Sequence, residues 1–152
     1  MSKTYELALA FMKKYPSTIA WRIKSHCKVI DKHLNPKEKV LYVFLGQKNR
    51  SSLDFTNTNV IVLTNKRLLF ATKRLLFGYF YTSVTPDMFN DISIIENMIW
   101  GRVTIDTLNE EIRLSNVSKN ALPEIETQIT EFMMKEKKKY KEKEPKENKG
   151  DE

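Results

Sequence analysis

The spacing of apolar residues changes twice along this chain, from helical to β-like and back to helical. Over the first 34 residues apolar positions recur every three or four residues, whereas from about residue 39 they form short runs or alternate with polar ones. Helical spacing returns near residue 120. This order predicts two N-terminal helices, a β-rich middle and one C-terminal helix.

The N-terminal part predicts two short amphipathic helices. The first lies within Thr4–Tyr15 and ends at Pro16, because the residue before a proline is pushed out of the α region. We expect Ser17 to cap a second helix that runs to about Leu34. Its apolar stripe consists of Ile19, Ile23, Cys27, Ile30 and Leu34. Each helix needs apolar surface to pack on, which either the rest of the chain or a neighbouring molecule could supply.

Seven strands are expected in the middle of the chain. Val60–Leu63 and Leu68–Thr72 flank a four-residue break, Thr64-Asn65-Lys66-Arg67, and so predict a tight hairpin. Asn65 is the expected first turn residue, since Asn tolerates the positive φ of such turns. The other expected strands are Lys39–Gln47, Tyr79–Val84, Ile92–Asn97, Arg102–Thr107 and Glu111–Leu114. Short connections favour antiparallel neighbours.

The last predicted element is an amphipathic helix from Ser118 or Asn120 to about Tyr140. Its apolar stripe consists of Leu122, Ile125, Ile129, Phe132 and Met133. Almost nothing apolar follows Met134, and we expect disorder from Pro145 onward. We therefore divide the chain into a helical N-terminal extension (1–35), a central domain (36–134) and a charged tail that passes from helix to disorder (135–152).

Charge and composition narrow the class of protein. The net charge is +7, and residues 1–39 carry most of it, with nine Lys or Arg against three acidic residues. That surplus would suit nucleic acid, anionic lipid or an acidic partner, but is also typical of a solvated helix face. The lone Cys27 suits a reducing compartment, and no secretory signal or apolar run of about 20 residues is present. We expect a cytoplasmic protein, with peripheral attachment at the inner face of the membrane as an alternative.

No pattern in the sequence indicates catalysis or a cofactor. Phosphate-binding glycine loops, zinc-binding His pairs and nucleophile elbows are all missing from the sequence. His26 and His33 are seven residues apart, about 10 Å along a helix, so we expect no metal site from them and Cys27. Trp21 among basic residues raises the possibility of nucleic-acid binding, but no recognition-helix pattern follows it. We expect no enzyme, no cofactor, no small-molecule substrate and no nucleic-acid partner.

A set of motifs then resembles the bacterial pleckstrin-homology (PH)-like domains, in particular the YokE-like group. They are LNPKEKV before the first strand, VIVLTNKRLLF at the hairpin, DISIIENMIWGRVTI and the terminal helix, over roughly residues 34–134. The resemblance implies a bent antiparallel barrel of seven strands, capped by the C-terminal helix. Some relatives by fold bind phosphoinositides through a basic loop between the first two strands. Here that loop offers only Lys48 and Arg50, which are few cations for a multiply charged headgroup.

The connection between the third and fourth strands is the main candidate contact surface. It combines two cations with three large apolar residues, which is the chemistry of a surface that touches a bilayer or a partner. The competing interpretation places these residues inside longer strands or in a subunit contact. The candidate contact residues are Lys48, Arg50, Lys73, Arg74, Leu75, Leu76 and Phe77. We expect a non-catalytic module for protein interaction or self-assembly, or alternatively a peripheral membrane adaptor.

Overall fold

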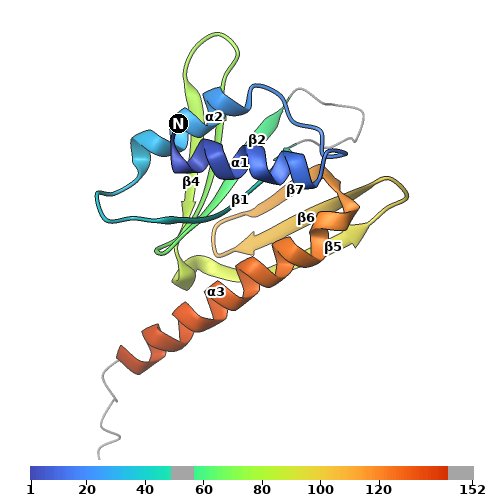
Figure 1. Ribbon diagram of the computed structural model, residues 1–152. Coiled ribbons are helices and arrows are strands. Elements are labelled where there is room, and N and C mark those ends of the chain that lie inside the picture. Colours follow the sequence, from blue (N-terminus) through green and yellow to red (C-terminus); the bar gives the residue numbers. More distant parts are fainter. Residues whose placement is uncertain (49–56, 144–152) are drawn as a thin grey trace, which may run out of the picture.

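The computed structural model describes residues 1–48 and 57–143 (Figure 1). The three α-helices of these residues are α1 (Lys3–Lys14), α2 (Ile23–His33) and α3 (Leu122–Lys143). The strands are β1 (Val40–Gln47), β2 (Thr58–Thr64), β3 (Leu68–Lys73), β4 (Tyr79–Val84), β5 (Phe89–Glu96), β6 (Trp100–Thr107) and β7 (Glu111–Ser118). Two short 3-10 helices, η1 (Pro86–Met88) and η2 (Lys119–Ala121), precede β5 and α3. The predicted element order is confirmed.

The seven strands form one bent antiparallel sheet in the order β4-β3-β2-β1-β7-β6-β5. Its two halves meet where β1 pairs with β7 through Gln47 and Ser115, and the sheet curls there into a half-barrel. The predicted fold, a bent barrel with a C-terminal helix and two N-terminal helices, is therefore confirmed. Strand β5 begins at Phe89 and β7 continues to Ser118, so both are longer than the sequence predicted.

Strands β2 and β3 are buried on both faces. Every residue of β2 is buried, and so is every residue of β3 except the last. The barrel interior covers one face, and α1 and α2 cover the other (Figure 1), where Phe11 of α1 packs against Phe44 of β1 with ring centroids 6.4 Å apart. Apolar residues of both helices therefore belong to the same core as the barrel. Of the two predicted alternatives for the N-terminal helices, packing on the rest of the chain is the one observed.

Helix α3 closes the other side of the barrel, and its apolar stripe is buried at Leu122, Ile125, Ile129 and Met133. Its first residue, Leu122, packs directly on Gly101 of β6. A Cβ added at residue 101 would lie 2.4 Å from the Leu122 side chain, so this contact requires glycine. Glu124 links α3 to α1 and β1 by accepting hydrogen bonds from Lys14 (2.6 Å) and Tyr42 (2.9 Å). The helix continues to Lys143, and the predicted disorder from Pro145 lies outside the described residues.

The predicted start of the second helix is wrong. Helix α2 begins at Ile23, not after Ser17, and Arg22 before it adopts a left-handed conformation with φ 54°. Residues 16–22 are not helical. Their backbone groups form hydrogen bonds with the sheet. The Ile19 N–H donates to the Asn116 carbonyl (2.9 Å), and the Ile19 carbonyl accepts from the Gln47 side chain (2.8 Å). Tertiary hydrogen bonds to β7 and β1 thus replace the first turns of the expected helix.

The turn between β2 and β3 also differs from its prediction. Its position is correct, since the Thr64 N–H donates to the Arg67 carbonyl (2.9 Å). Among the described residues, however, Arg22 and Asn116 are the non-glycine positions with positive φ, so Asn65 does not adopt the conformation expected of it. The Thr64 hydroxyl satisfies the turn instead, accepting from the N–H groups of Lys66 and Arg67, both at 3.1 Å.

None of the helices in the described part of the chain is both long enough and apolar enough to cross a membrane.

Candidate binding surface

The tip of the β3–β4 hairpin, defined as Leu75, Leu76 and Phe77, is exposed. The exposed fractions of these three residues are 79%, 80% and 83%. The hairpin projects past α2 at the top of Figure 1. The interpretation that buries these residues in longer strands is therefore wrong for this chain, because β3 ends at Lys73 and β4 begins at Tyr79.

The hairpin tip is a short loop whose ends are joined by backbone hydrogen bonds. The last strand pair is Lys73 with Tyr79, and the Arg74 N–H then donates to the Gly78 carbonyl at 3.0 Å. Gly78 closes the loop with φ 76°, a conformation that residues with a Cβ rarely adopt. The loop presents three consecutive large apolar side chains to solvent, and the described residues leave each of them about four-fifths exposed.

The N-terminus of α2 anchors the base of the hairpin. The Arg22 guanidinium donates to the carbonyl oxygens of Lys73 (3.1 Å) and Arg74 (3.5 Å). The buried His26 ring accepts the Lys73 N–H at Nδ1 (2.8 Å), and its Nε2 lies 3.0 Å from the Trp21 carbonyl. Because Nδ1 is an acceptor, the proton is on Nε2 and the ring is neutral. His26 thus joins β3 to the segment that carries Trp21.

This arrangement predicts a pH dependence of stability. Burial, together with the charge of Arg22, lowers the pKa of His26 to about 4. The unfolded chain therefore binds a proton at this site between about pH 6.5 and pH 4 that the folded chain does not, and stability falls as the pH falls through that window. We expect a loss of up to about 3 kcal/mol. It is measured as the free energy of urea unfolding across the window.

The matched variant is His26→Asn, whose side-chain oxygen can keep the hydrogen bond from the Lys73 N–H. Carboxyl groups also titrate at low pH, so the quantity that matters is the difference between the wild-type and variant profiles. Identical profiles for the two proteins would contradict the role given to His26.

A groove lies between Trp21 and the hairpin, with a cavity volume of about 750 Å³. Its apolar lining consists of Trp21, Leu75, Leu76, Phe77 and Phe80. Trp21 itself is 59% exposed. Three cationic residues also border the groove, namely Arg22, Lys73 and Arg74, and the Arg74 guanidinium lies 5.3 Å from the Phe80 ring centroid. The surface therefore combines apolar side chains with positive charge.

The structure brings most of the predicted contact residues together. Lys73, Arg74 and the three residues of the hairpin tip share one groove. Lys48 lines a smaller neighbouring cavity on which Phe80 also borders. Arg50 lies outside the described residues. The sequence interpretation missed Trp21 and Arg22 as part of this surface, since they reach it through a contact between the Trp21 N–H and the Thr58 hydroxyl (3.0 Å), 37 residues apart.

The histidines and the cysteine serve structural contacts. Cys27 is buried in the core, and burial raises the pKa of its thiol to about 12. The His33 ring stacks on Tyr81 with centroids 3.9 Å apart. Within residues 1–48 and 57–143, no group of three or more His, Cys, Asp or Glu is placed to hold a metal ion.

Comparison with known proteins identifies the family. No curated protein matches the chain. The solved structures that resemble it include a pleckstrin homology domain from Shewanella amazonensis SB2B, with 13% identity and a TM-score of 0.47 over 70% of this chain and 83% of that one. They also include a DUF1696 family protein with a pleckstrin-homology domain from Shewanella loihica PV-4, with 15% identity and a TM-score of 0.50 over 70% of this chain and 88% of that one. At such identities the second likeness supports a shared fold alone. The family model of the bacterial PH domain matches residues 34–131, which is more than half of the chain, and the protein therefore belongs to the bacterial PH domain family.

Proposed function

We propose that this protein is a non-catalytic binding module that attaches to anionic membrane surfaces through the tip of the β3–β4 hairpin. The observation that carries this proposal is the exposure of three consecutive large apolar residues, each about four-fifths exposed, at the end of a projecting hairpin. Full burial of one such side chain contributes about 1.5–3 kcal/mol. Entry of the tip into the acyl boundary of a bilayer would recover that free energy.

The charges around the hairpin favour an anionic surface. Arg22, Lys73 and Arg74 lie at the base of the tip, where lipid headgroups would be when the tip is inserted. Each cation near an anionic leaflet contributes about 1 kcal/mol. Apolar residues for the acyl boundary and cations for the headgroups are thus arranged in the order that a bilayer requires.

The hairpin is also held in place before it meets a membrane. The hydrogen bonds of Arg22 and His26 fix its base, and Gly78 fixes its loop. An ordered binding element loses less conformational entropy on binding than a flexible one. The hairpin can therefore bind a membrane in the conformation that it has in the free protein.

We further propose that the protein is cytoplasmic and attaches peripherally to the inner face of the membrane. Its one cysteine is a buried free thiol, which suits a reducing compartment. Within the family we propose the YokE-like group. That assignment is based on the order of VIVLTNKRLLF, Ile92-Ser93 and Gly101–Ile105 along the chain.

The variant Phe77→Ser tests the proposed function. We expect it to weaken binding to phosphatidylglycerol vesicles about tenfold or more, because it removes one apolar anchor from the bilayer. The measurement is vesicle flotation with wild type and variant. Since Phe77 is exposed in the free protein, thermal unfolding of the two should be alike.

The matched control is Met98→Ser, which removes an apolar side chain that is 89% exposed in the turn between β5 and β6. It should bind vesicles like the wild type. Raising the ionic strength from about 0.1 M to about 1 M shortens the Debye length from about 10 Å to about 3 Å and should weaken binding. Binding that is equal on phosphatidylcholine and phosphatidylglycerol, or unchanged by Phe77→Ser, would contradict the proposal.

A protein partner is the second candidate, and one observation favours it. Strand β5 is at an edge of the sheet and carries the exposed Ile95, and the turn that follows it exposes Met98 and Ile99. Exposed sheet edges accept an added strand from another chain. Light scattering that shows a mass rising with protein concentration, in a protein that does not float with vesicles, would favour this candidate instead.

A further inference from the structure

The groove beside the hairpin tip has two walls that come from different parts of the chain. The β3–β4 hairpin forms one wall and belongs to the segment that the family model matches. Trp21 is in the other wall and precedes that segment, which begins at residue 34. The groove is therefore a feature that the N-terminal segment adds to the barrel.

The backbone of the Trp21 wall is held by hydrogen bonds, which makes the groove a preformed site. The Trp21 N–H donates to the Thr58 hydroxyl of β2 at 3.0 Å, and its carbonyl lies 3.0 Å from His26 Nε2. The indole ring is nevertheless mostly exposed. A large apolar ring on a fixed backbone, facing a cavity and not buried, is what a site for an apolar ligand presents.

The lining specifies the chemistry of the ligand. Its apolar side chains suit a hydrocarbon chain, and the cations Arg22, Lys73 and Arg74 suit a negative head at the end of that chain. The cavity volume of about 750 Å³ lies within the range of about 300–1,000 Å³ that is usual for small-molecule sites. A neutral apolar ligand would bring no negative charge to the three cations, and a free anion would leave the apolar walls in water.

We propose that this groove binds one acyl chain of an anionic lipid, with the lipid phosphate beside Arg22, Lys73 and Arg74. The inference rests on the proposed membrane function, since the bilayer is the source of the lipid. It adds that the protein takes up a single lipid between Trp21 and the hairpin tip, in addition to inserting the tip. A chain in the groove would cover the parts of Trp21 and Phe80 that now face solvent.

The experiment uses dodecyl phosphate, a single-chain phosphate monoester, below its micelle concentration. The protein contains two tryptophans, Trp21 and Trp100. In the full-length variant Trp100→Phe, tryptophan fluorescence therefore comes from Trp21 alone. We expect a saturable shift of Trp21 emission to shorter wavelength as dodecyl phosphate is added. Calorimetry on the unsubstituted protein should give the same affinity.

Two probes and two variants separate the parts of the site. Inorganic phosphate lacks the chain and dodecyltrimethylammonium reverses the charge, and we expect neither to bind detectably. Trp21→Ser should weaken dodecyl phosphate binding about tenfold or more, measured by calorimetry, because it removes one wall of the groove. Met98→Ser, remote from the groove, should bind dodecyl phosphate like the wild type.

The outcomes distinguish this inference from the proposed function. Vesicle binding that is lost in Phe77→Ser, without any binding of monomeric dodecyl phosphate, overturns the groove and leaves the membrane function in place. Equal binding of the phosphate and ammonium amphiphiles, or binding unaffected by Trp21→Ser, also overturns the groove as proposed. The absence of both vesicle and dodecyl phosphate binding overturns the two proposals together.

Discussion

A chain that starts at Leu34 is expected not to fold, although the family match begins there. Helices α1 and α2 cover the outer face of β1, β2 and β3, and without them about half of the buried residues of β2 and β3 would face water. Exposure of each large apolar side chain costs about 1.5–3 kcal/mol, and several such losses exceed the roughly 5–15 kcal/mol that stabilises a typical domain. Far-UV circular dichroism and urea unfolding should show no cooperative transition.

Point variants test the same packing without removing the helices. Phe11→Ala of α1 and Ile30→Ala of α2 both act at fully or nearly fully buried positions. We expect each to lower the free energy of unfolding by about 2–5 kcal/mol. The exposed Lys28 of the same helix offers the control, since Lys28→Ala should change stability by no more than about 0.5 kcal/mol. Cooperative unfolding of the truncated chain, at a stability close to that of the full chain, would contradict the prediction.

The apolar runs of β2 and β3 in the sequence are a signal for this packing. Val60–Leu63 and Leu68–Ala71 are continuous apolar runs, whereas a strand with one face in water alternates. Arg102–Thr107 does alternate, and its buried residues are Val103, Ile105 and Thr107. The two continuous runs therefore indicate a sheet covered on both faces, and the two amphipathic helices before them are the segments available to cover the second.

Other features depended on contacts that no local pattern encodes. Ile19 lies at helical spacing from Ile23, yet residues 16–22 bond to strands that follow them by about 30 to 100 residues in the sequence. The position of Trp21 in the binding surface follows from those bonds. The sequence predicted Leu75, Leu76 and Phe77 as candidate contact residues but left their burial in longer strands open, and the ends of β3 and β4 decide for exposure. The second wall of the groove had no local signal.

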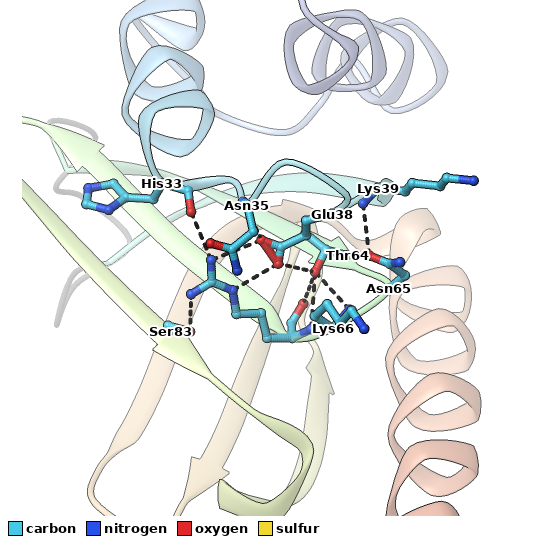
Figure 2. A network of polar contacts seen from close by, with 9 residues as sticks. His33, Asn35, Glu38, Lys39, Thr64, Asn65, Lys66 and Ser83 are labelled. Atoms are coloured by element: carbon cyan, nitrogen blue, oxygen red, sulfur yellow. Dashed lines mark hydrogen bonds and ion pairs between the residues drawn. The ribbon is translucent and has the colours of Figure 1, made fainter.

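No local sequence pattern predicted the buried ion pair between Glu38 and Arg67. The Glu38 side chain is 0% exposed, and both of its oxygens accept from the Arg67 guanidinium at 3.0 Å. Arg67 also donates to the His33 carbonyl (2.9 Å) and the Ser83 hydroxyl (3.1 Å). Figure 2 shows how these groups converge. One guanidinium thus joins the end of α2, the β2–β3 turn and β4.

Replacing Arg67 by Ala is expected to lower the free energy of unfolding by about 3–5 kcal/mol, because it leaves the Glu38 carboxylate buried without a counter-charge. Burial by itself disfavours the ionised form of Glu38, but hydrogen bonds from Arg67, the Asn35 N–H and Thr64 outweigh it and hold its pKa below the usual value. Removal of Arg67 should therefore also raise the pKa of Glu38. Urea unfolding measures the first effect, and NMR titration of the Glu38 side chain measures the second.

Two further variants separate charge from packing. Lys66→Ala changes the exposed neighbour in the same turn, whose N–H bond to Thr64 does not involve its side chain, and should alter stability by no more than about 0.5 kcal/mol. The double variant Glu38→Leu with Arg67→Met removes both charges and keeps apolar volume, and should recover most of the loss. If Arg67→Ala costs less than about 1 kcal/mol, the pair is not a main link between α2 and the sheet. If the double variant is as unstable as Arg67→Ala alone, then the bonds from Arg67 to His33 and Ser83, and not the unpaired carboxylate, account for the loss.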